Sequence, residues 1–237
     1  MSSKLIIALD FPSEDKALDF VSQLSPADCK LKVGFELFVS AGPEIVRKLT
    51  EKGFDIFLDL KFHDIPNTVA SVCKAASKLN VWMMNVHASG GSEMMRAAYN
   101  ALHDDEVENT KSAKLIAVSV LTSMSDEQLQ QTGVSTLAKD QVMHLAKMVQ
   151  QAGLDGLVCS AQEATVLRQE LGKDFLLVTP GIRPIGFAKG DQSRVMTPAT
   201  AVISGVDYLV VGRPITEAEN PLEVIQTINA EVRDALQ

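Results

Sequence analysis

The sequence is poor in cysteine and has no long apolar run, and each of these scarcities excludes a class of protein. Its three cysteines, Cys29, Cys73 and Cys159, form no C-x-x-C pair, which disfavours a disulfide framework and indicates a reducing, cytoplasmic compartment. The first apolar run, residues 5–9, ends at Asp10 and is too short for a secretion signal or a membrane span. We therefore expect a cytoplasmic protein without a membrane anchor.

Basic residues are also scarce relative to acidic ones. The chain has 22 Lys and Arg against 30 Asp and Glu, a net charge of −8, which disfavours nucleic-acid binding through a basic surface. It also lacks the G-x-G-x-x-G fingerprint of a dinucleotide-binding turn. Hydrophobic residues make up 46% of the 237 residues, enough for a sizeable core. A small-molecule substrate is therefore the better expectation.

Short apolar, β-branched runs recur along the whole chain. Most are continuously hydrophobic rather than alternating, which is typical of parallel strands covered by helices. Segments with a helical period lie between them, and Ser13, Pro43, Ser125 and Pro221 mark helix starts. The predicted strands are residues 5–9, 30–33, 54–60, 81–86, 115–121, 156–160, 175–179 and 208–212.

Eight strand-and-helix units in 237 residues give about 30 residues per unit, the usual size of such a unit. The economical architecture is an α/β fold with a single (β/α)8 TIM barrel spanning residues 1–237. The alternative is an open, doubly wound sheet, which commonly has fewer strands and needs a glycine-rich turn after the first one. No linker or low-complexity tract divides the chain.

Charged residues end the predicted strands, where a barrel of this kind carries its chemistry. In the run 54–62 the even positions are apolar, so Asp59 and Lys61 should point inward together. An isolated Asp–Lys pair is usually a structural ion pair. Lys32 on the preceding strand and Asp64 in the next loop extend the pair to an alternating set that would be costly to bury without a catalytic purpose.

The stretch from Gly181 to Arg194 contains three glycines and carries a net charge of +2 within an acidic chain. Long irregular loops in compact domains are usually functional, although a solvated surface loop is the alternative. Gly212 and Arg213 follow the eighth strand, and the loops after strands seven and eight of such barrels often hold a phosphate. We therefore expect an anionic ligand at this side of the barrel.

The four histidines share no metal-ligand spacing, and no cluster of carboxylates resembles a Zn or Mg site. Asn85 and His87 end the fourth strand without a clear partner in the sequence. The prediction is a site without a protein-bound metal.

The motif D-L-K-F-H-D-I-P-N-T at 59–68 resembles the signature of the orotidine 5′-phosphate decarboxylases, which make UMP in pyrimidine biosynthesis. The resemblance spans the chain. It includes A-L-D ending at Asp10, K-V-G beginning at Lys32, V-L-T-S-M (120–124), T-P-G-I-R-P (179–184), G-D-Q (190–192) and V-G-R-P (211–214).

The resemblance implies a cofactor-free decarboxylation of orotidine 5′-phosphate to UMP and CO2. Lys61 would be the general acid that protonates C6 of the pyrimidine, and Asp59 would lie against the departing carboxylate. Lys32 and Asp64 would complete the charged set. Asp64, Ile65 and Thr68 would reach into the neighbouring subunit's site, so the resemblance also implies a homodimer.

The remaining substrate-binding residues follow from the other matched motifs. Asp10 would bind the ribose hydroxyls, and Thr122 and Ser123 would bind the pyrimidine edge. Pro180 would also contact the substrate, and the phosphate would be held by Arg183, Gln192, Gly212 and Arg213.

Two alternatives stay open on the sequence. Barrels that decarboxylate or condense ketose phosphates also carry a D-x-K-x-x-D set on strand three, but they use Mg²⁺, so sensitivity to EDTA would separate them. A nucleotide-binding barrel that has lost its chemistry would bind UMP without turnover.

Overall fold

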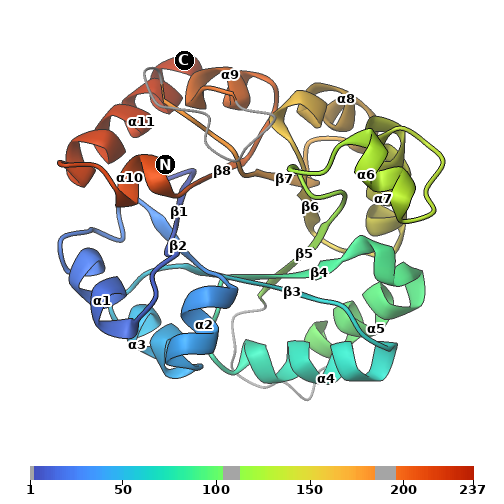
Figure 1. Cartoon of the computed structure of the whole chain (residues 1–237), viewed down its shortest axis with the longest axis horizontal. Helices are drawn as coiled ribbons and strands as arrows, with labels where there is room; N and C mark the ends of the chain where they lie inside the picture. The colour runs from blue at the N-terminus through green and yellow to red at the C-terminus, as the bar shows by residue number, and fades with distance from the viewer. Residues whose placement is uncertain (1–2, 104–112, 185–195) are drawn as a thin grey trace.

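Eight parallel strands close into a barrel in the computed structural model, which describes residues 3–103, 113–184 and 196–237 (Figure 1). Each strand pairs with the next in the sequence, and β8 pairs with β1. The predicted barrel and all eight predicted strands are confirmed. The strands are β1 (Leu5–Ala8), β2 (Lys30–Val33), β3 (Ile56–Phe62), β4 (Met83–His87), β5 (Lys114–Val118), β6 (Gly156–Val158), β7 (Leu176–Thr179) and β8 (Tyr208–Val211).

Helices surround the strands as an outer ring (Figure 1). They are α1 (Glu14–Ser22), α2 (Phe35–Ala41), α3 (Glu44–Glu51), α4 (Pro66–Ser77), the short 3₁₀ helix η1 (Ala88–Gly90), α5 (Gly91–His103), α6 (Asp126–Gln131), α7 (Ala138–Gln151), α8 (Ala161–Leu171), α9 (Pro198–Ile203), α10 (Arg213–Thr216) and α11 (Pro221–Ala235).

The predicted helix starts have a local cause in the structure. The Ser13 side chain accepts the Lys16 backbone N–H at the start of α1, and Ser125 forms a capping box with Gln128 at the start of α6. Pro221 opens α11, where its missing N–H has no intrahelical partner to lose. Pro43 differs slightly from the prediction, because it precedes the first turn of α3 as the cap residue.

Alternation along the strands divides the apolar core into two layers. The larger layer lies between the strands and the helices, and it contains Ile56 and Leu58 of β3. The smaller layer fills the inside of the barrel, and Phe57 belongs to it together with residues such as Met83 and Ile116 from β4 and β5. The predicted faces of β3 are therefore confirmed, with Leu60 and Phe62 also packed against the outer layer.

β3 is not a regular strand along its whole length. Leu58 pairs with Met84 and Phe62 pairs with Val86, so three residues, 59–61, stand opposite the single residue Asn85. The two extra residues form a bulge, and Lys61 adopts a φ of 46°. Few residues other than glycine adopt positive φ, and such residues concentrate at functional sites.

No helix within the described residues is long and apolar enough to cross a membrane. Cys29, Cys73 and Cys159 are buried and free of disulfides, as predicted. Burial raises the pKa of each of these thiols to about 12, which makes them unreactive near neutral pH.

Candidate active site

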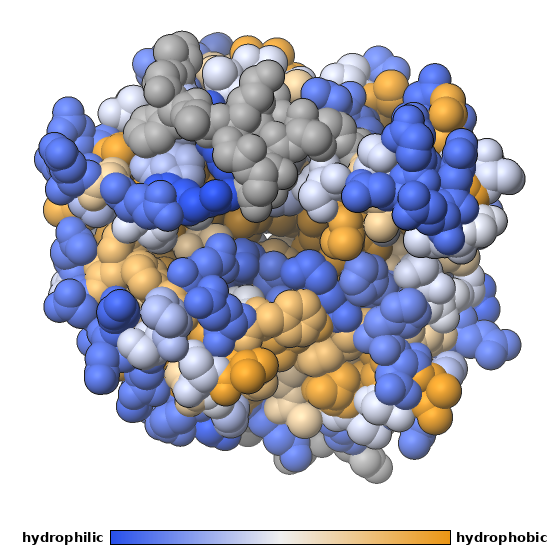
Figure 2. All heavy atoms as spheres, viewed as in Figure 1, coloured by the Kyte–Doolittle hydropathy of each residue, from blue (hydrophilic) through white to orange (hydrophobic). Residues whose placement is uncertain are grey.

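The carboxyl ends of the strands surround a cavity of about 220 Å³. Figure 2 looks into this mouth of the barrel, where hydrophilic side chains lie along the lower edge of a central hollow. Three predicted charged residues and three predicted substrate-binding residues line the cavity, beside an apolar wall from β5, β6 and β8. The lining residues are Lys32, Phe57, Asp59, Lys61, Val118, Val120, Leu121, Thr122, Ser123, Val158, Pro180 and Val210.

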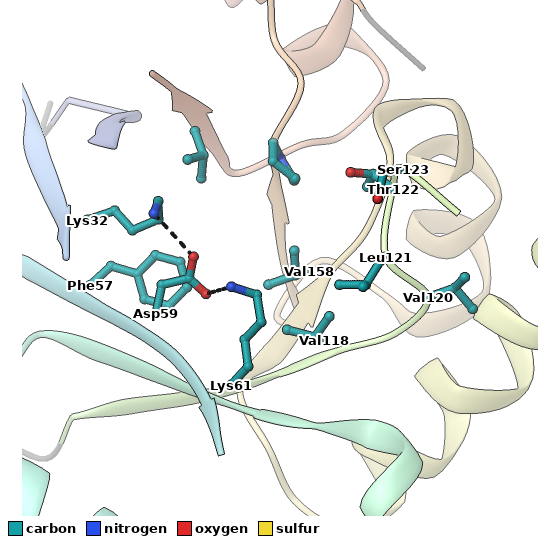
Figure 3. Close-up of a pocket in the computed structure, with 12 residues that line it drawn as sticks. Lys32, Phe57, Asp59, Lys61, Val118, Val120, Leu121, Thr122, Ser123 and Val158 are labelled. Atoms are coloured by element: carbon teal, nitrogen blue, oxygen red, sulfur yellow. Dashed lines mark hydrogen bonds and ion pairs between the residues drawn. The ribbon is translucent and has the colours of Figure 1, made fainter. Parts of the chain in front are cut away.

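Four charged side chains form a continuous array beside the cavity: Lys32 of β2 and Asp59 and Lys61 of β3, which line it, and Asp10, which follows β1. The Asp59 carboxylate is in the centre, with Oδ1 2.7 Å from Lys61 Nζ and Oδ2 3.3 Å from Lys32 Nζ (Figure 3). Lys32 Nζ is also 3.3 Å from Asp10 Oδ1. The alternating set predicted from the sequence is Lys32, Asp59, Lys61 and Asp64; the structure brings the first three together, and Asp10 instead of Asp64 is the fourth member.

Asn85 belongs to the same cluster, although the sequence analysis gives it no role. It is fully buried on β4, its Nδ2 donates to Asp59 Oδ1 at 2.7 Å, and its Oδ1 accepts the Lys61 backbone N–H at 2.8 Å. One signal in the sequence points to it. Asn85 lies two residues after Met83 on the inward face of an otherwise apolar strand, where a polar side chain needs partners.

The structure does not bring Asp64, Ile65 and Thr68 into the cavity of their own chain. All three are exposed, on the loop after β3 and the first turn of α4. Asp64 Oδ1 accepts the Ile65 backbone N–H at 2.7 Å, and the Ile65 side chain is 67% exposed.

Thr122 and Ser123 lie across the cavity from Lys61, on the loop that follows β5 (Figure 3). Thr122 is buried and Pro180, after β7, lines the same space. Together these residues offer hydroxyl groups opposite the charged array, an arrangement suited to a ligand that bridges the cavity.

Arg183 and Arg213 approach each other at the β7 and β8 side of the barrel. Burial, and then the positive charge of Arg213, lower the pKa of the Arg183 guanidinium. Two guanidinium groups that repel each other are stabilised when an anion binds between them. Gly212 precedes Arg213 in the chain, and a β-carbon there would make ordinary van der Waals contact with Ala8 Cβ, at 3.5 Å. The predicted phosphate ligand Gln192 lies outside the described residues.

His63 and His87 form a second titratable pair near the array, with ring centroids 5.6 Å apart. Burial, and then the neighbouring His63 and Lys61, lower the pKa of His87, so its ring is neutral near pH 7. Within the part of the chain that the structure describes, no group of three His, Cys, Asp or Glu side chains could hold a metal ion.

Comparisons with known proteins agree with this geometry. The family model for orotidine 5′-phosphate decarboxylase / HUMPS matches residues 3–228. A protein of Pseudoalteromonas translucida (strain TAC 125) named orotidine 5′-phosphate decarboxylase is 56% identical over 231 residues, covering 98% of this chain and 97% of its own. One of Nitrosococcus oceani with the same name is 56% identical, covering 97% of each chain.

The chain belongs to the orotidine 5′-phosphate decarboxylase / HUMPS family. A crystal structure of orotidine 5′-phosphate decarboxylase from Lactobacillus acidophilus has the same fold, with a TM-score of 0.87 and 42% identity over 96% of this chain and 98% of that one. Family membership confirms the resemblance inferred from the 59–68 motif. In the structure, Asp59 and Lys61 of this motif line the cavity.

Proposed function

We propose that this chain decarboxylates orotidine 5′-phosphate to UMP and CO2 in pyrimidine biosynthesis, without a cofactor. The observation that carries the proposal is the Lys61 ammonium, which lines the cavity 2.7 Å from a buried carboxylate in a member of this family. The relatives that share 56% identity bear the name of this activity, which favours it over a Mg²⁺-dependent reaction on ketose phosphates.

The reaction requires a charge at a fixed point. When the bond between C6 and the carboxylate breaks, CO2 leaves and the electron pair stays at C6 in the plane of the ring, where the π system cannot delocalise it. In the proposed mechanism Lys61 Nζ donates a proton to C6, which completes UMP, and the neutral amine then recovers a proton from water. A positive charge held in place before the reaction is usually the largest catalytic contribution.

The charged array supports this role for Lys61. Asp59 holds the ammonium in position, while Lys32 and Asp10 continue the alternation of charge away from it. In the proposal Asp59 lies beside the substrate carboxylate. The Lys32 ammonium then balances part of the negative charge of these two carboxylates. Buried charges of this kind are stable only when each is paired, which the alternation achieves.

The other parts of the substrate have candidate partners around the cavity. Thr122 and Ser123 would bind the pyrimidine edge, and Asp10, next to Gly212, would bind the ribose. The phosphate would lie between Arg183 and Arg213, whose mutual repulsion it relieves. Gly212, next to Arg213 in the chain, and Gln192, which the family motif assigns to the phosphate, would complete the proposed phosphate end, while Pro180 would contact the substrate within the cavity.

Binding energy from the phosphate end would then support the reaction at C6, some distance away. Replacing Arg213 with alanine should weaken inhibition by UMP while leaving inhibition by the nucleoside uridine unchanged. An equal loss for both ligands would reject the phosphate role.

The proposed active unit is a homodimer in which Asp64, Ile65 and Thr68 complete the site of the neighbouring subunit. Apolar side chains are exposed on this loop and on α2: Ile65 on the loop, and Phe35 and Val39 on α2, which are 55% and 82% exposed, with the Phe35 ring centroid 5.3 Å from Lys61 Nζ. Figure 2 shows an apolar surface at the mouth face between α2 and α4. Exposed apolar groups clustered beside a site support an interface there.

Mixing inactive subunits tests the shared site. Lys61→Ala and Asp64→Ala homodimers should each be inactive, and subunit exchange should restore one intact site per heterodimer. No recovery, when differently tagged subunits show that exchange has occurred, would mean that each site is built within one chain.

Two broader features follow from the same proposal. Residues 1–237 would form one catalytic domain, since the barrel closes between β1 near the beginning and β8 near the end of the chain. The protein would act in the cytoplasm, which its three free, buried cysteines support.

The deciding experiment follows the ultraviolet absorbance of orotidine 5′-phosphate with the purified protein in excess EDTA, and measures CO2 release in parallel. Conversion to UMP is the expected result. Turnover of ketose phosphates alone, and only with Mg²⁺, would identify a barrel that decarboxylates or condenses ketose phosphates. UMP binding without any turnover would identify a nucleotide-binding barrel.

A further inference from the structure

Asn85 is a fully buried polar side chain at the base of the charged array. It points inward from β4, next to Met83 of the inner core layer, and its backbone pairs with Ile116 of β5. An amide in such a place is stable only if its polar atoms are hydrogen-bonded. Its two observed partners, Asp59 and Lys61, are the residues that the proposed chemistry requires.

These partners fix the orientation of the amide without ambiguity. The Lys61 backbone N–H can only donate, so the atom facing it must be Oδ1, 2.8 Å away. An ionised Asp59 carboxylate can only accept, so the atom facing it must be Nδ2, 2.7 Å away. Only a side chain with a donor and an acceptor at this length can satisfy both partners at once.

The bulge in β3 explains why such a side chain is needed. Since residues 59–61 stand opposite Asn85 alone, the regular ladder between β3 and β4 is interrupted. The Asn85 side chain supplies the acceptor for the Lys61 N–H in place of a strand carbonyl. Lys61 also has a positive φ, a conformation that costs a residue other than glycine roughly 1–3 kcal/mol and persists only where its surroundings hold it.

We propose that Asn85 is the positioning residue of the active site, holding the Lys61 backbone in its strained conformation and the Asp59 carboxylate in line with the Lys61 ammonium. This inference rests on the proposed role of Lys61 in decarboxylation. Asn85 itself does not line the cavity, so it acts through its two partners.

Two substitutions separate positioning from packing. Asn85→Leu keeps a similar shape and removes both hydrogen bonds. Asn85→Asp keeps the acceptor for the Lys61 N–H but places a second carboxylate against Asp59. Each variant should lower kcat roughly 100-fold, the cost of misplacing a reacting group by about 1 Å, while the affinity for UMP stays close to that of the wild type.

The aspartate variant provides a further readout, because a protonated carboxyl has the same donor and acceptor pattern as the amide. The ratio of its kcat to that of the wild type should therefore rise as the pH is lowered. The titratable groups around position 85 are Asp59 and Lys61 on β3, Lys32 on β2, and the histidines His63 and His87; the β5 partner, Ile116, does not titrate. Dividing by the wild-type value at each pH removes their shared contribution.

Asn229→Leu is a matched control. Asn229 on α11 also makes two hydrogen bonds, to Ser3 and to the carbonyl of Asp28, but lies outside the cavity. Its loss should lower the free energy of unfolding and leave kcat unchanged. Lys61→Ala, assayed in parallel, reports on the proposed function separately, because turnover in that variant would reject the role of Lys61 whatever Asn85 does.

The inference is overturned if kcat of folded Asn85→Leu stays within threefold of wild type while Lys61→Ala is inactive. If the leucine variant does not fold, the isosteric Asn85→Asp variant tests the inference in its place. A kcat ratio that does not change with pH would then overturn the inference, and a ratio that rises toward acidic pH would support it.

Discussion

Two lysines on β2 lie in different surroundings at the two ends of the barrel. Lys30 and Lys32 are two residues apart, so both point into the barrel, and both are buried. Lys30, at the amino end, pairs with Asp55 and lies over the Trp82 ring, 4.6 Å from its centroid. Lys32, at the carboxyl end, lies 3.3 Å from both Asp10 and Asp59 beside the cavity.

The amino end is closed by side-chain packing. Trp82 and Tyr208 meet edge to face with centroids 4.9 Å apart, and burial raises the pKa of the Tyr208 hydroxyl. The carboxyl end instead leaves its charges beside an open cavity. Lys30 is paired and covered within the packed end of the barrel, whereas Lys32 lies beside a cavity where its charge can act on a ligand, so the surroundings decide the role of each lysine.

The largest loss of kcat is expected for Lys61→Ala, which removes the proposed proton donor at the open, carboxyl end of the barrel. We expect kcat to fall by roughly 10,000-fold, since both a general acid and a fixed charge are lost, while UMP binding remains measurable. Steady-state kinetics on orotidine 5′-phosphate and UMP inhibition provide the check. Turnover within tenfold of the wild type would refute the role.

The same position also tests the backbone strain. Because Lys61 has a positive φ, glycine should be tolerated there better than alanine, the reverse of their usual order. We expect Lys61→Gly to be about 1 kcal/mol more stable than Lys61→Ala in urea unfolding. A glycine variant that is less stable would show that the strain has little energetic effect.

Replacing each β2 lysine with methionine tests the difference between the ends directly. Lys32→Met should lower kcat roughly 100-fold by removing a charge from the array. Lys30→Met should leave kcat unchanged and lower the free energy of unfolding by about 1 kcal/mol through the lost cation–π contact. The comparison fails if both variants lose activity to the same extent.

A smaller effect is expected at Gly34, next to Lys32. Its backbone φ of −98° suits any residue, but an added β-carbon would lie 2.9 Å from Lys32 Nζ. Gly34→Ala should therefore push the ammonium aside and lower kcat roughly tenfold with little loss of stability. An unchanged kcat would show that Lys32 can move without harm to the reaction.

The smallest effect concerns His87, the half-buried histidine of the open end. Because its pKa in the folded protein lies below the usual 6.5, the unfolded chain takes up the proton more readily. This contribution to stability is present above pH 6.5 and is lost as the pH falls. Replacing His87 with glutamine should therefore make the unfolding free energy vary less between pH 7 and 5, as urea unfolding at a series of pH values would measure.

Much of the barrel and of its charged array can be predicted from the sequence, because both depend on local patterns of residues. The apolar runs predict the eight strands, and alternation within β3 predicts that Asp59 and Lys61 share a face. Strand order then places Lys32 next to them. Each inference uses only periodicity and the regular connections of a parallel barrel.

The bulge and its consequences could not be predicted in the same way. Alternation predicts which face of the sheet each residue occupies, but it does not predict which residue of the next strand it pairs with. The sequence therefore does not reveal that residues 59–61 lie opposite Asn85 alone. The roles proposed for Asp64 and Thr68 would depend on a second chain. Spacing in one sequence identifies such residues only through the family motif.

The two oxygens of Asp59 are both engaged, by donors on three adjacent strands: Lys32 on β2, Lys61 on β3 itself and Asn85 on β4. A carboxylate tied in this way cannot rotate aside when a second negative charge is placed next to it. In the proposed complex that second charge is the carboxylate of the substrate. The repulsion is then relieved by the one group that is free to leave, which departs as uncharged CO2.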